Sequence, residues 1–310
     1  MTKQKDLAII CDQRTIEDRN LGEKDGAMWD QRPFYLINKI FKNEYTPPLY
    51  VPIEDIGSYS LDGIDVAFLH IDLSVHNSDI TNAINVSLPE NIRVYNRKIT
   101  DITKKHIETA YVSMGGPKLT LTRSDSYKGD VMVKSNFNAG DSQGRGYKVM
   151  PSEEVSDNDW NNQDLLIQPF ISSKRDFQED GYGRMDRYVK FLEEIVCCSF
   201  FSKEPIIKRS TSIWEYFRDL NELERDFKSK KRICLNDEKI FYRTLTSNEI
   251  LYRNTILELA DLIGLDFGSI DTITTPDGKL YVLDVNKTPW ERGIPNHFIN
   301  LFRRYSGVSK

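Results

Sequence analysis

The sequence predicts an α/β protein that begins with a parallel α/β domain and continues as a strand-dominated α+β structure. Three observations support this. Short apolar runs alternate with a helical stripe over about the first 95 residues. From residue 129 onward, strand-like runs dominate. Two of these runs meet at Asp277-Gly278, a strong signal for a β-hairpin.

The amino-terminal part, predicted as a domain over residues 1–96, alternates strand, helix and strand. Residues 6–11 (DLAIIC) form a short apolar run typical of a buried strand. A helix is expected over 26–42, where Phe34, Ile37 and Phe41 share one stripe. Two further strands are expected at 49–53 and 65–72. This order is typical of a parallel sheet with helical connections.

The rest of the chain mixes strands with two helices. A helix is expected over 99–113, ended by Gly115-Gly116-Pro117. A second helix should begin at Thr246 and Glu249, which have capping-box spacing, and end at Gly264. Strands are expected at 129–135, 164–170, 187–202, 204–210 and on both sides of Asp277-Gly278 within 265–286.

Composition limits the kind of protein. The 310 residues suffice for two or three domains, and 39% hydrophobic with 29% charged residues suits a folded globular chain. The net charge of −5, with both signs mixed, gives no basic field for nucleic acid or a membrane surface. Apolar runs are too short for a signal peptide or a membrane span, so we expect a cytoplasmic protein. The four cysteines lack zinc-site spacing and should be reduced.

The hairpin places polar residues opposite each other. A two-residue turn at Asp277-Gly278, or a four-residue loop around it, sets Asp271 across from Asp284 and Ser269 across from Asn286. Side chains alternate along a strand, so all four share one face. A three- or five-residue loop would break this register.

Two directly opposed carboxylates destabilise a sheet unless a cation lies between them. Asp271, Asp284 and Asn286 offer the oxygen ligands that suit Mg²⁺ together with substrate phosphates. A solvent-exposed sheet face with hydrated acids is the alternative interpretation.

Other residues could bind phosphate or a purine. Lys134 precedes a loop with Gly140, Gly144 and Gly146, where backbone N–H groups could approach phosphate oxygens. An ordinary polar loop is the alternative.

Gln168, Phe170 and Ile171 could line a purine slot or simply belong to a core. Arg187 and Lys208 could hold a phosphate if they point inward, and are surface charges if they do not.

Taken together, the segments VMVKSNFNAG, LLIQPFI and IDTITTPDGKLYVLDVNKTP resemble the ATP-grasp superfamily. The resemblance covers roughly residues 95–290. It implies a two-subdomain ATP-grasp fold after the amino-terminal domain, with a small subdomain over 97–170 and a carboxy-terminal subdomain over 171–310. VYNRKITDITKKHI and SKEPIIK are similar to a subgroup of the superfamily without an assigned substrate.

The resemblance implies roles for individual residues. Asp271, Asp284 and Asn286 would hold two Mg²⁺ ions, which Mn²⁺ can replace. Lys104 (or Lys105) and Lys134 would bind ATP, and Gln168, Phe170 and Ile171 would hold its adenine. The remaining implied residues are Asn138 and Gly140 in the glycine loop, and Lys208, Arg187 and Arg292 as the catalytic cations.

Two positions depart from the family pattern. Ser269 stands where many family ligases carry an arginine that contacts the reacting phosphate, and Arg187, Arg253 or Arg292 could supply that charge. Asp284 stands where glutamate is commoner.

The resemblance implies an ATP-dependent carboxylate–amine or carboxylate–thiol ligase that works through an acyl phosphate. Its substrate would be a small amino acid or a peptide-like molecule, bound near His70, Asp72 and Arg292, and a homodimer is compatible with it. A small-molecule kinase on the same fold and a non-catalytic nucleotide-binding module are the alternatives.

Overall fold

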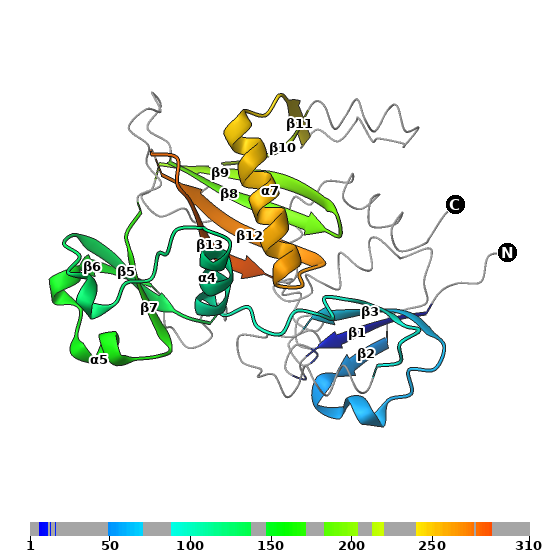
Figure 1. Cartoon of the computed structure of the whole chain (residues 1–310). Coiled ribbons are helices and arrows are strands. Elements are labelled where there is room, and N and C mark those ends of the chain that lie inside the picture. The colour runs from blue at the N-terminus through cyan, green and yellow to red at the C-terminus, as the bar shows by residue number, and fades with distance from the viewer. Residues whose placement is uncertain are drawn as a thin grey trace.

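Three β-sheets organise the described part of the chain in the computed structural model (Figure 1). The structure describes residues 6–11, 13, 16, 49–70, 88–137, 147–171, 183–203, 213–219, 240–275 and 277–286. The helix expected over 26–42 and the strand expected over 204–210 lie outside these residues. The parallel and antiparallel strands and the helices of these residues agree with the predicted α/β and α+β class. The domain boundaries at 96 and 170 stay predictions.

The amino-terminal sheet is parallel throughout, as predicted. Its strand order is β2-β1-β3-β4, and every neighbouring pair runs in the same direction. The strands expected at 6–11, 49–53 and 65–72 are present, and a short strand at 93–95 was not foreseen. The elements are β1 (Asp6–Cys11), β2 (Leu49–Pro52), a 3-10 turn η1 (Ile53–Ser58), β3 (Ile64–His70) and β4 (Arg93–Tyr95).

A small antiparallel sheet of three strands, ordered β6-β5-β7, follows. One of its faces buries Val131, Val133 and Ile167 against Val155, so the opposite face is left for other partners. The elements are α4 (Lys104–Ser113), η2 (Arg123–Asp125), β5 (Asp130–Ser135), β6 (Lys148–Pro151), η3 (Ser152–Glu154), α5 (Asp157–Asn161) and β7 (Leu165–Pro169).

A six-stranded sheet, ordered β11-β10-β9-β8-β12-β13, forms the carboxy-terminal part. Helix α7 packs on one of its faces, where Ile256, Leu259 and Ala260 join the same core as Ile270 and Val285. The elements are β8 (Gly183–Phe191), β9 (Glu194–Ser202), β10 (Ile213–Asp219), β11 (Ile240–Arg243), α7 (Ser247–Leu262), β12 (Phe267–Thr274) and β13 (Leu280–Asn286).

Both ends of α7 follow the sequence prediction. The Thr246 hydroxyl accepts a hydrogen bond from the Glu249 N–H at 3.2 Å, and the Glu249 carboxylate accepts one from the Thr246 N–H at 3.0 Å. After the helix, Gly264 has φ +75°, and a Cβ there would lie 2.7 Å from the backbone of Lys98. Glycine is therefore required where this helix ends.

The hairpin has the predicted pairing at the acids but not the predicted loop. Asp271 faces Asp284 and Ser269 faces Asn286. Thr275 and Lys279 flank a three-residue loop, because the Thr275 N–H donates to the Lys279 carbonyl at 2.9 Å. The two- or four-residue loop was therefore wrong. A bulge at Leu283, which has no partner between the Thr272–Val282 and Asp271–Asp284 pairs, shifts the register back.

The amino-terminal domain packs against the six-stranded sheet through aromatic rings. Phe68 of β3 stacks on Tyr95 with a centroid separation of 4.7 Å, and Phe267 of β12 meets Phe68 edge-on at 6.3 Å. Phe191 of β8 lies 5.6 Å from Tyr95. The contact therefore joins the ends of β3 and β4 to the strands that carry Asp271 and Arg187.

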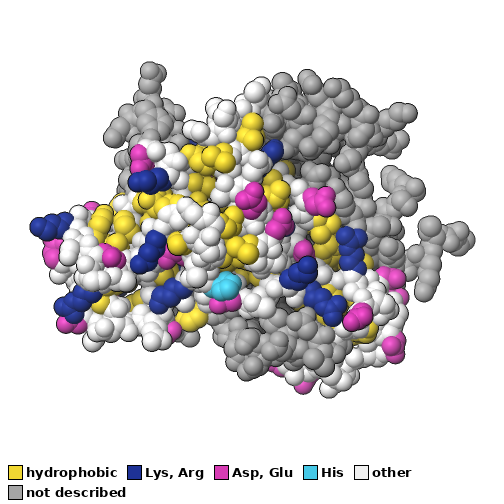
Figure 2. Space-filling view, in the orientation of Figure 1, with side chains coloured by type: hydrophobic (Ala, Val, Ile, Leu, Met, Phe, Trp, Pro, Cys, Tyr) yellow, Lys and Arg dark blue, Asp and Glu magenta, His cyan; other side chains and the backbone are white. Residues whose placement is uncertain are grey.

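Charged side chains of both signs are interspersed on the face shown in Figure 2. Within the described residues, no helix is long and apolar enough to cross a membrane. The three cysteines in those residues, Cys11, Cys197 and Cys198, form no disulfide, which is compatible with the reduced state expected from the sequence.

Candidate active site

Three charged side chains form a row across three neighbouring strands. Asp284 on β13 faces Asp271 on β12, and Asp271 faces Arg187 on β8. Alternation along β12 puts them on the face opposite Ile270, whose side chain packs under α7. The row therefore lies on the face that α7 does not cover.

The Arg187 guanidinium donates two hydrogen bonds to the Asp271 carboxylate. Nε donates to Oδ1 at 2.5 Å and Nη2 donates to Oδ2 at 2.7 Å. Its carbon lies 5.3 Å from the centre of the Phe200 ring. Although burial lowers the pKa of Arg187, the Asp271 carboxylate outweighs it and raises that pKa. Such a bidentate, largely buried pair is strong and orders both side chains.

Asp284 has a weaker cationic partner. The Lys104 Nζ lies 3.7 Å from its Oδ1, and the Asp284 side chain is 29% exposed. Burial raises the pKa of Asp284 and the nearby Asp271 raises it further, while Lys104 opposes the shift. The shift has the sign that two facing acids should give; Lys104 and Arg187 offset part of their repulsion, and a metal cation between the acids would offset more.

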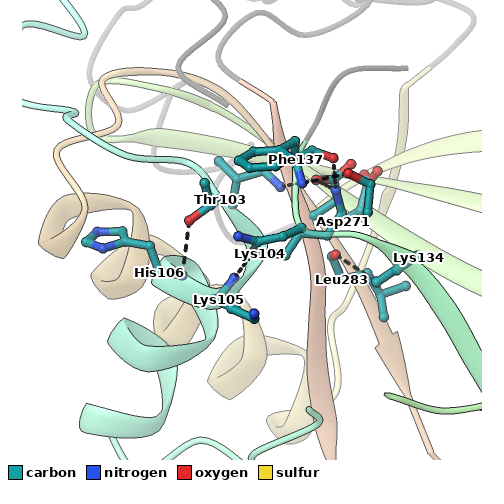
Figure 3. Close-up of polar contacts among 12 residues, drawn as sticks. Thr103, Lys104, Lys105, His106, Lys134, Phe137, Asp271 and Leu283 are labelled. Atoms are coloured by element: carbon teal, nitrogen blue, oxygen red, sulfur yellow. Dashed lines mark hydrogen bonds and ion pairs between the residues drawn. The ribbon is translucent and has the colours of Figure 1, made fainter. Parts of the chain in front are cut away.

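Lys104 and Lys134 approach the hairpin from two different elements (Figure 3). The Lys104 Nζ donates to the Phe137 carbonyl at 2.7 Å, at the root of the predicted glycine loop. The Lys134 Nζ donates to the Leu283 carbonyl at 3.3 Å. The bulge that restores the acid pair thus also supplies the acceptor for Lys134. Burial, assisted by the charge of Lys104, lowers the pKa of Lys134 to about 8.

The first turn of α4 is held by a residue that the sequence did not single out. The Asn136 side-chain oxygen accepts from the Lys105 N–H at 2.9 Å, and its backbone carbonyl accepts from the Lys104 N–H at 2.9 Å. The Lys105 Nζ donates to the Gln163 carbonyl at 2.6 Å. Of the two alternatives, Lys104 is therefore the lysine that faces the hairpin. Only the position of Asn136 after a strand-ending lysine hinted at its role.

The small sheet carries apolar and polar side chains on the same face as Lys134. Met132 pairs with Gln168 and Lys134 pairs with Leu166, so these four residues share one face. Gln168 is buried and its Nε2 donates to the Thr120 hydroxyl at 3.4 Å. Phe170 is held by its N–H, which donates to the Asp130 carbonyl at 2.8 Å, and Ile171 follows it. Their assignment to adenine stays a prediction.

The donor set of the hairpin fits a hard divalent cation. Two carboxylates and an amide, from Asp271, Asp284 and Asn286, lie on one face, and Mg²⁺ takes few protein oxygens when it also binds phosphate. Within the described residues, no group of three or more histidines, cysteines or acids is arranged for a metal. The fit therefore depends on the acid pair together with the amide and with oxygens from a ligand.

The remaining predicted residues divide into two groups. Arg253 lies on α7, on the other face of the sheet, so Arg187 is the described arginine that lies beside the acids. Ser269 is fully buried, and its Oγ makes no hydrogen bond to the described part of the chain. Outside the described residues lie Asn138, Gly140, Lys208, Arg292 and Asp72.

Comparison with solved structures identifies the fold. The VanG D-Ala:D-Ser ligase of Enterococcus faecalis aligns over 99% of both chains, with a TM-score of 0.59 and 11% identity. The ATP-grasp ligase PsnB, bound to a variant of its minimal precursor, Mg and ADP, aligns over 98% of this chain and 99% of its own, with a TM-score of 0.55 and 11% identity. The ADP complex of PurK, an N5-carboxyaminoimidazole ribonucleotide synthetase, aligns over 95% and 74%, with a TM-score of 0.51 and 13% identity.

No protein-family model and no curated protein sequence matches the chain. The chain nevertheless has the fold of ATP-grasp ligases, which the sequence resemblance implied for roughly residues 95–290, and the alignments cover 98–99% of the chain. At 11–13% identity, this similarity establishes the fold and leaves the chemistry to be argued from the site.

Proposed function

We propose that the protein is an ATP- and Mg²⁺-dependent ligase that joins a carboxylate to an amine or thiol through an acyl phosphate. The observation that carries this proposal is the facing pair Asp271 and Asp284, approached by Lys104 and Lys134 from separate elements. Two acids that hold a metal and two lysines that hold phosphate are the groups needed to position a triphosphate.

The protein's own residues would act by position and charge. Lys104 and Lys134 would neutralise the phosphates, and Arg187 would stabilise charge that develops on the transferred phosphoryl group. Mg²⁺, when bound to Asp271, Asp284 and Asn286, would draw charge from the phosphate oxygens. A substrate carboxylate attacks the γ-phosphorus and ADP leaves. The nucleophile then displaces phosphate from the acyl carbon.

The acceptor would bind where the amino-terminal domain meets the six-stranded sheet. The carboxyl end of β3 is joined to β12 through Phe68 and Phe267, and Phe267 lies four residues before Asp271. Among the comparison structures, PsnB and MdnC are bound to precursor peptides. A small amino acid or a peptide-like molecule is the substrate class that we propose.

The test is ADP release from Mg²⁺-ATP across a panel of amino acids and short peptides. We expect turnover with at least one of them, and Asp284→Ala should reduce it by about 10²-fold or more, as loss of a charge-stabilising group does. Full turnover by Asp284→Ala would contradict the assignment. ATP binding without turnover across a broad panel would favour a nucleotide-binding module.

A kinase is the second candidate, because Ser269 occupies the position of an arginine that many family ligases carry. Product mass separates the two reactions. A stable product heavier by one phosphoryl group would indicate a kinase, whereas a product that joins two substrates with loss of water would indicate a ligase.

A further inference from the structure

The metal site proposed above already contains a cationic side chain, that of Arg187. Both oxygens of Asp271 accept hydrogen bonds from Arg187, and this carboxylate should also bind the metal. The Arg187 side chain is 17% exposed and that of Asp271 is 8% exposed, so water screens the pair only weakly. A metal ion that approaches Asp271 therefore meets an ion pair rather than a free carboxylate.

The two acids differ in how strongly they are held. Asp284 has Lys104 at 3.7 Å and a hydrogen bond from the Val285 N–H at 3.0 Å. Asp271 has two short, charge-assisted bonds to one planar group. Asp284 can accept a metal without losing a strong partner, whereas Asp271 must exchange one cation for another.

The Arg187 guanidinium has other contacts available if it leaves Asp271. Its guanidinium lies over Phe200, and this contact does not depend on Asp271. Its Nη1 makes no hydrogen bond to any described residue, so it still has donors for an anion. In the ladder between β8 and β12, Val189 pairs with Ser269 directly beside the Arg187–Asp271 pair. The guanidinium thus lies diagonally next to the position of the missing family arginine.

We propose that Arg187 holds the place of the metal on Asp271 in the nucleotide-free protein, and that binding of a metal–nucleotide complex displaces it toward the reacting phosphate beside Ser269. This inference rests on the proposed function, because it needs a metal that arrives with a nucleotide. The exchange keeps Asp271 paired in both states. It also makes metal binding depend on the nucleotide, whose phosphates receive the released arginine.

The test is Mn²⁺ binding to the nucleotide-free protein, followed by electron paramagnetic resonance. Arg187→Gln leaves Asp271 without its cation, and we expect its Kd for Mn²⁺ to be at least about tenfold lower than that of the wild type, since one close charge pair is removed from the competition. Arg187→Lys keeps the charge and should stay near the wild-type value. The double variant with Arg187→Gln and Asp271→Asn should not show this tighter binding of Mn²⁺. An Arg187→Gln Kd equal to or higher than that of the wild type would overturn the proposal.

A second measurement uses the unaltered protein, in case Arg187→Gln does not fold. In protein labelled with ¹⁵N-arginine, the Nε–H resonance of Arg187 should be shifted by its carboxylate partner. AMPPNP with Mg²⁺, which keeps a γ-phosphate and is not hydrolysed, should move this resonance, whereas AMPPNP with EDTA should not. Binding of Mg²⁺-AMPPNP with an unchanged resonance would overturn the exchange and leave the proposed function intact. Failure of Mg²⁺-AMPPNP to bind at all would overturn the proposed function and the exchange with it.

Discussion

At the scale of one residue, Lys134 places a charge where it destabilises the fold, as we expect of a residue that serves a ligand. Burial and the nearby charge of Lys104 lower the pKa of its amino group from 10.5 to about 8. Below pH 8 the folded state therefore carries a charge that the unfolded chain solvates better, at a cost of about 3 kcal/mol. That cost is relieved as the pH rises from 8 toward 10.5.

Lys134→Met should therefore stabilise the nucleotide-free protein. At pH 7 we expect the free energy of unfolding to rise by about 1–3 kcal/mol, because methionine fills similar space without a buried charge. The gain should fall as the pH rises above 8 and should approach zero only above pH 10.5, where the lysine is neutral in both the folded and the unfolded chain. Urea unfolding at pH 7 and pH 9.5 should therefore give a clearly smaller gain at the higher pH. The rise in Tm that Mg²⁺-ADP causes in the wild type should be lost.

Lys148→Met is the matched control for this change. Lys148 lies on β6 in the same sheet, is exposed, and pairs with Val133 on the opposite face. Its replacement should change the free energy of unfolding by less than about 0.5 kcal/mol. A loss of 1 kcal/mol or more in Lys134→Met at pH 7 would show that the lysine stabilises the fold.

At the scale of the element, the hairpin shows what a sequence can and cannot specify. Alternation and the Asp277-Gly278 turn correctly predicted that Asp271 faces Asp284. The loop length was wrong, and the pair survives because the bulge at Leu283 restores the register. No local sequence signal marks that bulge. The Leu283 carbonyl accepts a hydrogen bond from Lys134, which lies 149 residues away along the chain.

Other elements show the same limit. The helix expected over 99–113 begins at Lys104, because Thr103 caps it and Asn136 accepts its first N–H groups. The strand expected over 187–202 is two strands that turn at Leu192, which has φ +53°. The Leu192 N–H donates to the Asp266 carbonyl at 2.7 Å, a contact that sequence alone does not reveal. Sequence alone also did not reveal that Arg187 pairs with Asp271, because the two residues lie 84 positions apart in the chain.

Asn136 should control how well α4 presents Lys104. Asn136→Ala removes the acceptor of the Lys105 N–H and should lower the free energy of unfolding by about 1 kcal/mol, as loss of a helix-capping group does. The first turn should fray and Lys104 should lose its fixed position, so the Kd for Mg²⁺-ADP should rise. Thermal unfolding and calorimetric titration measure the two effects.

Asn136→Asp is the control, because it keeps the acceptor and adds a negative charge at the helix N-terminus, where such charges are favourable. Its stability should match that of the wild type. If Asn136→Ala left both stability and nucleotide affinity unchanged, the Thr103 cap and the buried residues Ile107 and Tyr111 would suffice to hold α4.

At the scale of the whole molecule, the amino-terminal domain is anchored beside the acid pair. Asn96 is buried between the two parts. Its Oδ1 accepts from the N–H groups of Asp266 and Phe267 at 2.9 Å each, and its Nδ2 donates to the Phe267 carbonyl at 2.8 Å. The aromatic rings of Phe68, Tyr95, Phe191 and Phe267 pack around this anchor. Substrate bound between the parts would thus be positioned by a rigid contact.

Phe68→Ala should weaken that contact without touching the acid pair. Removing a buried ring typically costs about 3–5 kcal/mol, and here the loss falls on the junction between two sheets. We expect scanning calorimetry to show two separated unfolding transitions in place of a coupled one. Mg²⁺-ADP should raise the later transition only, because the residues that we propose to bind the nucleotide lie on α4, the small sheet and the six-stranded sheet. Phe68→Leu keeps most of the apolar volume and should retain coupled unfolding. A single, uniformly shifted transition in Phe68→Ala would mean that the hydrogen bonds of Asn96 and the buried core that both parts share suffice to couple them.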